Sequence, residues 1–316
     1  MDGQIRHIVL GVAEIADGDP HLGPAVELAE SLGATLHVVH AYRLPDPAPY
    51  PTIESVVLNQ EAVQQIHEGV QARLEGEVRK ISESDRIVCR AVPAPADGAI
   101  LKVVEDVGAD LVMVGATRRG AIGRKILGTT AQRISRASGV PVLVSRRRDL
   151  YPVSRVLLTS DLSELSAKVH VRGLQILERL AAPERVELRS LLVYGSEIPF
   201  PPPVSQHRIL AAAEGKLNEF LEPIRAAGTA IDARVREGDA DEAIIEEAAE
   251  WPADLLILGT HGRTGASRFL IGSVAEAVLR SAPCNVLLIP AAALGSGDLA
   301  ATSRAGATHP SAIRAE

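Results

Sequence analysis

The sequence predicts an α/β fold with two doubly wound domains, each built on an open parallel sheet of five strands. Three observations predict it. Short runs rich in Val, Ile and Leu alternate with amphipathic segments, as expected for strands that are buried on both faces of a sheet. A helix between successive strands requires parallel strands with right-handed crossovers. The second half of the chain also repeats the first, and 316 residues are enough for two domains.

The repeat is clearest in two segments that contain glycines and end in an apolar triplet. The matching features are Gly115, Gly128 and residues 142–144 in the first half, and Gly259, Gly272 and residues 286–288 in the second. The predicted domains are residues 1–149 and 150–292. Residues 293–316 are rich in Ala, Gly, Ser and Thr without periodicity, which predicts a disordered tail.

Each half contains five apolar runs of strand length. The predicted strands are residues 7–12, 35–42, 86–92, 110–115 and 140–145, then 155–159, 185–194, 230–237, 254–259 and 284–290. Between them, apolar residues recur every three or four positions, which is typical of amphipathic helices. Two such stripes are Val63, Ile66, Val70, Leu74, Val78 and Ile81, and Leu210, Ala213, Leu217, Leu221 and Ile224. The proline-rich segments 45–51 and 199–203 favour rigid crossover loops over partner motifs.

Composition argues against several classes of protein. The net charge is −7 and aromatic residues make up only 3% of the chain, so neither counterion release nor base stacking favours nucleic acid as a partner. No apolar run approaches the ~18 residues of a membrane span. No basic segment precedes a signal-type stretch at the start of the chain, so a cytoplasmic location is expected.

The cysteines and one histidine pair do not predict a metal site. Cys89 and Cys284 lie far apart without metal-ligand spacing, so both are expected to be buried as small apolar side chains. His37 and His40 lie three apart in a predicted strand, where their side chains point to opposite faces.

Residues with nucleotide-binding chemistry gather in the second half. Ligands of open α/β sheets bind outside the carboxyl ends of the strands, where the strand order reverses. The strand at 254–259 leads into a glycine-rich segment and then a helix, a combination that offers backbone N–H groups to phosphate. Asp161, which follows the first strand, offers a carboxylate to a ribose hydroxyl or an adenine amino group. Alternatively, the glycines only form turns and caps, and Asp161 is the N-cap of a helix that begins near Ser163.

The pattern Gly259-x2-Gly262-x9-Gly272-Ser273 resembles the nucleotide-binding signature of the universal stress protein family. The resemblance extends over two tandem copies to about residue 290. It implies Rossmann-like domains of the adenine nucleotide alpha hydrolase-like type that bind ATP, with or without Mg²⁺. It further implies that Asp161 contacts the nucleoside and that the Val193 backbone meets the adenine. Around the ribose and phosphates, the implied residues are Gly259, Gly262, Gly272 and Ser273, with His261, Arg263 and Val274 in the same segment. His261 either touches a phosphate or a metal-bound water, or faces solvent.

The resemblance implies a regulator rather than an enzyme. The sequence contains neither GxxxxGK[ST] nor GxGxxG, and no acidic pair is evidently placed to hold Mg²⁺, although slow hydrolysis is left open. A nucleotide-independent scaffold and an ATP-using enzyme are the alternative functions. In the family the fifth strand commonly mediates dimerisation, so residues 141–144 and 285–288 predict an intrachain pseudo-dimer, and two chains could associate further.

The first half departs from this pattern at three positions. Arg118 stands at the place of Gly262, Ala13 at the place of Asp161, and Ala94 at the place of Gly238. Without the carboxylate and with a side chain where backbone should approach phosphate, the first site is expected to be degenerate. Arg118 and Arg119 could still bind phosphate through their charges. One nucleotide per chain, in the second domain, is the prediction.

Overall fold

The computed structural model divides into two compact units, the first domain before residue 153 and the second from residue 153 onward, with residues 279–281 grouped with the first. The described residues are 4–15, 18–44, 53–116, 118–119, 125–146, 150, 153–180, 186–195, 206–260 and 271–294. Both proline-rich segments and the tail from residue 295 lie outside this set, so the predictions for them are not addressed.

The first domain contains a parallel sheet in the order β7-β4-β1-β2-β3. Its strands are β1 His7–Val12, β2 Thr35–Ala41, β3 Ile87–Val92, β4 Leu111–Gly115 and β7 Val142–Ser145. Its helices are α1 Leu22–Leu32, α2 Ile53–Arg79, α3 Ala96–Val107 and α4 Thr129–Ala137. A short antiparallel pair, β5 Arg118–Arg119 and β6 Lys125–Ile126, was not predicted.

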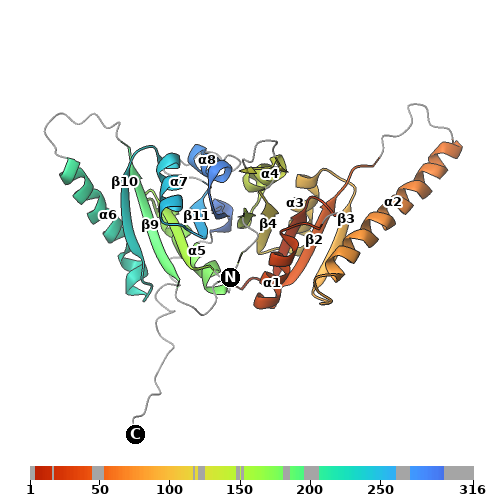
Figure 1. The fold of residues 1–316 in the computed structure, drawn as a ribbon, viewed down its shortest axis with the longest axis horizontal. Helices are drawn as coiled ribbons and strands as arrows, with labels where there is room; N and C mark the ends of the chain where they lie inside the picture. Colours follow the sequence, from red (N-terminus) through yellow and green to blue (C-terminus); the bar gives the residue numbers. More distant parts are fainter. Residues whose placement is uncertain are drawn as a thin grey trace, which may run out of the picture. The chain divides into compact units, whose positions relative to one another are not determined.

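The second domain repeats this topology as β12-β11-β8-β9-β10, also parallel (Figure 1). Its strands are β8 Arg155–Ser160, β9 Glu187–Tyr194, β10 Asp232–Glu237, β11 Leu255–Gly259 and β12 Asn285–Ile289. Its helices are α5 Glu164–Leu180, α6 Gln206–Ala226, α7 Ala240–Glu250 and α8 Ser273–Ser281, followed by the 3-10 turn η1 Ala291–Ala293. All ten predicted strands are present, with ends within about two residues of those expected. The two doubly wound parallel sheets are confirmed.

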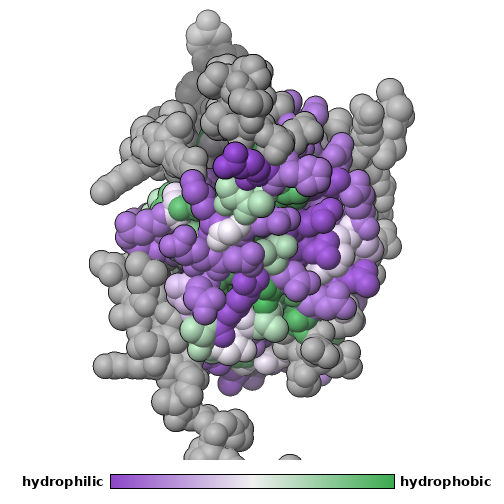
Figure 2. Space-filling view, turned by 90° about the vertical axis from the view of Figure 1, so that its left-hand side faces the viewer, coloured by the Kyte–Doolittle hydropathy of each residue, from purple (hydrophilic) through white to green (hydrophobic). Residues whose placement is uncertain are grey.

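The later residues of the predicted helical stripes lie in the core, whereas Val63, Ile66, Val70, Leu210 and Ala213 are half-buried. Leu74 and Val78 of α2 are buried, as are Leu217 and Leu221 of α6. Ile81 was expected to extend the first stripe, but α2 ends at Arg79 and Ile81 is 48% exposed. Opposite its buried stripe, α6 is polar, and in Figure 2, which shows the side of the molecule where α6 lies, hydrophilic side chains cover most of the described surface. Among the described residues, no helix is long and apolar enough to cross a membrane.

The two cysteines differ in their surroundings. Cys284 is buried, as expected, whereas Cys89 is only half-buried, so that prediction is wrong for Cys89. Residue 89 belongs to β3, which ends its sheet and is therefore covered less completely than the central strands. Partial burial raises the pKa of the Cys89 thiol to about 11, which keeps the thiol protonated. No disulfide joins the two residues.

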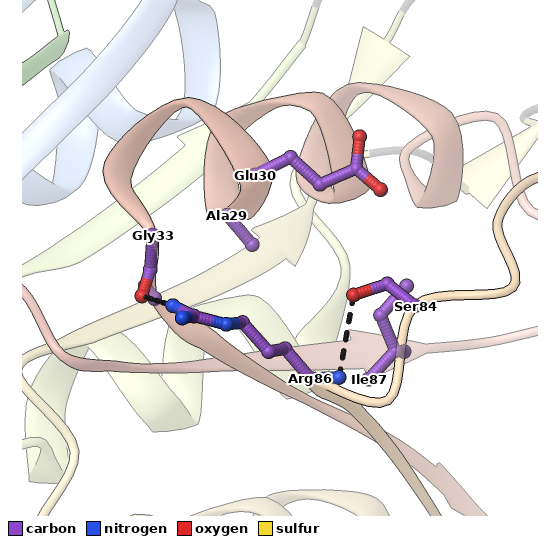
Figure 3. A pocket seen from close by; sticks show the side chains of 7 residues that line it. Ala29, Glu30, Gly33, Ser84, Arg86 and Ile87 are labelled. Atoms are coloured by element: carbon purple, nitrogen blue, oxygen red, sulfur yellow. Dashed lines mark hydrogen bonds between the residues drawn. The ribbon is translucent and has the colours of Figure 1, made fainter.

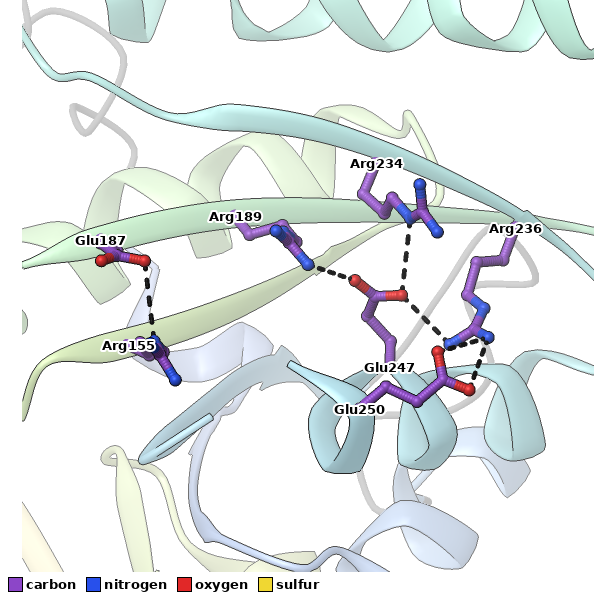
Figure 4. Close-up of polar contacts among 7 residues, drawn as sticks. All are labelled: Arg155, Glu187, Arg189, Arg234, Arg236, Glu247 and Glu250. Atoms are coloured by element: carbon purple, nitrogen blue, oxygen red, sulfur yellow. Dashed lines mark hydrogen bonds and ion pairs between the residues drawn. The ribbon is translucent and has the colours of Figure 1, made fainter. Parts of the chain in front are cut away.

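An ion cluster around the buried Glu247 fastens α7 to the outer strands of the second domain (Figure 4). The Glu247 side chain is only 2% exposed and lies within ion-pair distance of three arginines. Its carboxylate is 2.7 Å from Nη1 of Arg189, 3.1 Å from Nη1 of Arg236 and 3.6 Å from Nε of Arg234. Arg236 also contacts the exposed Glu250 at 2.9 Å. The Arg189 guanidinium lies 4.2 Å from the ring centre of Trp251.

Candidate functional site

The carboxyl ends of β8, β9 and β11 bring three of the predicted site residues to one edge of the sheet. Asp161 directly follows β8, and Ser160 pairs with Leu192, so Asp161 and Val193 are the next residues along their strands. Gly259 is the last residue of β11, the strand that flanks β8 on its other side. Asp161 and Val193 are both half-buried.

A backbone hydrogen bond joins the end of β11 to the start of α8. The N–H of Gly272 donates to the carbonyl of Thr260 at 2.7 Å. Gly272 is the N-cap residue of α8, and as a glycine it makes no side-chain bond to the first turn of the helix. Ser273, which is exposed, and Val274 therefore present first-turn N–H groups at the same edge. The predicted site residues His261, Gly262 and Arg263 lie outside the described part of the chain.

The turn that carries Asp161 is closed by hydrogen bonds and has an unusual backbone. Oδ1 of Asp161 accepts from the N–H of Ser163 at 3.0 Å. Leu162 between them has a φ of 63°, a left-handed conformation that costs a residue with a Cβ roughly 1–2 kcal/mol. The N-cap of α5 is Ser163, whose Oγ accepts from the N–H of Ser166 at 3.1 Å. The alternative prediction that Asp161 is the N-cap is therefore wrong, because Ser163 holds that position.

A polar group behind this turn was not predicted from the sequence. His170 of α5 is fully buried, with Nδ1 2.8 Å from the carbonyl of Ser166 and Nε2 2.9 Å from Oγ of Ser190 on β9. The carbonyl can only accept, so Nδ1 carries the proton and Nε2 accepts from the Ser190 hydroxyl. Oγ of Ser166 lies 3.1 Å from Oγ of Ser160, which accepts from the N–H of Leu162 at 3.0 Å. Periodicity places residue 170 on the buried face of α5 but does not reveal its partners.

Because His170 is buried, the stability of the second domain is expected to depend on pH. Burial lowers the pKa of His170 from 6.5 to about 4. Between these values the unfolded chain binds a proton that the folded domain does not. The free energy of unfolding should therefore fall as the pH drops from 6.5 towards 4, by ~3 kcal/mol in all, and then level off. Urea unfolding at pH 7, 5.5 and 4.5 measures this loss. If the second domain still showed this dependence after His170→Leu with Ser190→Val, groups other than His170 would be its source.

The first domain has a different structure at the matching positions. Backbone pairing joins Arg118 to Ile126 and Arg119 to Lys125, so backbone groups of these four residues are used in an antiparallel ladder. Gly128 begins α4 as Gly272 begins α8. However, a Cβ on Gly128 would meet no atom within 4 Å, whereas one on Gly272 would lie 3.3 Å from the carbonyl of Thr260. The close approach of helix start to strand end is specific to the second domain.

A histidine covers the end of β4 in the first domain. The buried His21 places Nδ1 2.9 Å from Oγ of Ser145. A Cβ on Gly115 would lie 2.5 Å from the His21 ring, so the imidazole packs directly against this glycine. Gly259, the match of Gly115 in the repeat, ends β11 beside the candidate site. The His21 ring therefore occupies the corresponding place in the first domain.

Ala13 stands where the second domain has Asp161, but another carboxylate, that of Asp19, lies at this edge of the first domain. Oδ2 of Asp19 accepts from the N–H of Ala13 at 3.1 Å, and Oδ1 accepts from the N–H of His21 at 2.9 Å. The helix after β1 begins only at Leu22, so the chain before it can bring Asp19 back to the strand end. Both oxygens nevertheless bind backbone donors of the same loop. This carboxylate holds the loop together.

The two histidines of the HxxH sequence have separate partners, as the strand geometry predicts. Nε2 of His37 lies 3.2 Å from Nδ1 of His7 on β1, whereas Nδ1 of His40 lies 3.1 Å from the carbonyl of Val12. Burial, with Arg90 and His7 nearby, lowers the pKa of His37 to about 4. Within the described ranges, no three His, Cys, Asp or Glu side chains are placed to hold a metal ion.

An open hollow of about 400 Å³ lies at the opposite edge of the first sheet (Figure 3). It is bounded by the end of α1 and the start of β3, where Arg86 donates to the carbonyl of Gly33 and its N–H donates to Oγ of Ser84 at 3.3 Å. Ligands of doubly wound sheets bind at the carboxyl ends of the strands. This hollow is at the amino ends, so it is not the candidate site.

Two doubly wound domains in tandem, each with a glycine at the start of the helix after its fourth long strand, define a tandem-repeat α/β protein. Residues 4–146 and 152–290 each match the model of the Universal stress protein family. The chain belongs to the universal stress protein family, as the resemblance in its sequence indicated.

Relatives and solved structures agree with this assignment. Universal stress protein Rv2319c of Mycobacterium tuberculosis is 29% identical over 200 residues, which cover 60% of this chain and 68% of the relative. Universal stress protein Rv2005c of the same species is 28% identical over 273 residues, covering 80% and 85%. A putative universal stress protein from Pseudomonas aeruginosa shares the fold, with a TM-score of 0.67 at 20% identity over 97% of this chain and 99% of that one.

Proposed function

We propose that the second domain binds ATP or a related adenine nucleotide at the carboxyl edge of its sheet, and that the nucleotide regulates the conformation or partner binding of the chain. The observation that carries the proposal is the hydrogen bond from Gly272 to Thr260. It brings the start of α8 to the end of β11, beside the strand that Asp161 follows. Donors for an anion and an acceptor for a nucleoside thus converge on one edge.

The residues of this edge fit such a ligand. A Cβ at position 272 would lie 3.3 Å from the Thr260 carbonyl, so glycine permits the close approach. The positive end of the α8 dipole favours the negative charge of a phosphate. Ser273 and Val274 would hold phosphate through their N–H groups, Asp161 would accept from the nucleoside, and the Val193 backbone would meet the base. When bound, the nucleotide supplies a charged group and a planar ring that join the strand ends to α8.

The proposal is binding rather than turnover. The sequence has no lysine in a phosphate-loop motif to reach the terminal phosphates. Assays for direct binding and for ATP turnover on the same preparation separate a nucleotide-binding regulator from an enzyme. Mass spectrometry of ligand retained after gentle purification would identify the nucleotide and its occupancy. If neither retained nor added nucleotide bound, the scaffold alternative would stand.

Asp161→Ala is expected to weaken nucleotide binding by 5- to 150-fold. The substitution removes an acceptor for the nucleoside, which is worth roughly 1–3 kcal/mol. Isothermal titration calorimetry measures the dissociation constant, and circular dichroism verifies that the domain is folded. Asp161→Asn is the matched control, because its amide oxygen still accepts from Ser163, which separates turn geometry from charge. Unchanged affinity in a folded Asp161→Ala protein would limit Asp161 to a role in the turn.

A further inference from the structure

The Asp161 turn and the polar group behind it form one connected set of hydrogen bonds. Ser190 on β9 bonds to His170, His170 bonds to the carbonyl of Ser166, and the Ser166 hydroxyl lies 3.1 Å from that of Ser160. The Ser160 hydroxyl accepts from the N–H of Leu162, the residue with the left-handed backbone. The set therefore runs from a neighbouring strand, through the first turns of α5, to the residue next to Asp161.

The first domain supplies an internal comparison. In both domains the helix ends 20 residues after the preceding strand, at Leu32 after Val12 and at Leu180 after Ser160, so positions match without a gap. Ten residues after the strand, His170 is replaced by Leu22. Six residues after it, Ser166 is replaced by Gly18. Ser190 pairs with Leu158, and its match Val38 pairs with Leu10 at the same level of the sheet.

The polar group is therefore not a requirement of the fold. Leu22 and Val38 are both buried in the first domain, where apolar side chains fill the positions that His170 and Ser190 fill in the second. Burying an imidazole and a hydroxyl gives no advantage over apolar packing unless their hydrogen bonds achieve something else. The difference that accompanies them is local. Helix α5 begins four residues after β8, whereas α1 begins ten residues after β1. In the first domain Gly18 has a φ of 71°, which is incompatible with a right-handed helix at that position.

We propose that Ser160, Ser166, His170 and Ser190 act as positioning residues that hold the carboxylate of Asp161 at the nucleotide site. The inference rests on the proposed function. Buried hydrogen bonds fix the first turns of α5 against β9 and stabilise the strained Leu162 backbone, so Asp161 is held in place before the ligand arrives. Partners behind a ligand-binding residue commonly set its orientation in this way.

The test is a double substitution, His170→Leu with Ser190→Val, which installs the residues of the first domain. The second variant, Ser166→Ala, removes the hydroxyl that bonds to Ser160 and to the carbonyl of Ser163, and it serves if the double variant does not fold. The dissociation constant for ATP is expected to rise about tenfold in each. In an Asp161→Ala background the same changes should cause no further loss, because they act through Asp161. Equal losses in both backgrounds, or no loss in a folded variant, would overturn the proposal.

Hydrogen exchange separates this proposal from the proposed function. Without nucleotide, the amides of Leu162 and Ser163 are expected to exchange at least about tenfold faster in both variants than in the wild type. If the wild type did not bind ATP and these amides were still destabilised, the nucleotide function would fail while the positioning role would stand. Unchanged exchange in both variants would overturn the positioning role. His21→Val in the first domain is the matched control, since it removes a buried histidine and should leave ATP affinity and these amides unchanged.

Discussion

Replacing Glu247 with valine is expected to lower the free energy of unfolding of the second domain by about 3 kcal/mol. The carboxylate is almost completely buried and is the common partner of Arg189, Arg234 and Arg236 (Figure 4). Its removal leaves Arg189 and Arg234 without this counter-ion, while Arg236 keeps Glu250. Urea denaturation followed by circular dichroism measures the change. Glu250→Gln is the matched control, since that side chain is 62% exposed and should cost less than about 1 kcal/mol.

The first domain shows how this loss can be reversed. Residue 247 is the eighth residue of α7, and the eighth residue of α3 is Val103. The sheet positions of Arg189 and Arg236 correspond to His37 and Val92. A triple variant with Arg189→His, Arg236→Val and Glu247→Val is therefore expected to be more stable than Glu247→Val alone, because removing Glu247 together with its two less exposed partners costs less than leaving those partners without it. A triple variant less stable than the single one would contradict this account.

The sheets could be predicted because each strand is a short apolar run, and the pattern reveals it without information about neighbours. The positions of Asp161, Gly259 and Gly272 at the carboxyl edge of the second sheet could also be predicted, since topology alone defines that edge in a doubly wound sheet. Periodicity also predicted the buried stripe of α2. It failed at Ile81 because an apolar residue just past a helix end continues the spacing without sharing the helix geometry.

Other features depend on contacts between distant residues and could not be predicted. The partners of His170 and Glu247 lie on neighbouring strands, so a buried polar residue in a helical stripe does not disclose them. The return of Asp19 to Ala13 depends on where α1 begins. Gly18 and Pro20 are the residues in the sequence that disfavour an earlier helix start, and they were the available signal. A comparison of where the first helix of each repeat can begin would have revealed the late start of α1.

Titration of the chain with ATP is expected to reveal one site per chain, in the second domain. In the first domain, residues 118–119 pair with residues 125–126, both oxygens of Asp19 bind backbone donors, and His21 covers Gly115. Each of these uses a group, or occupies a place, that a nucleotide would need.

At an ATP concentration 100 times the dissociation constant, binding should stabilise the second domain by about 2.7 kcal/mol and leave the first unchanged. Calorimetry gives the stoichiometry, and hydrogen exchange resolved by domain locates the stabilisation. Asp161→Ala should weaken this one site, and Arg118→Gly should leave it intact. Two sites of similar affinity would show that the first domain rearranges to bind nucleotide, because its described backbone offers no equivalent of the bond between Gly272 and Thr260.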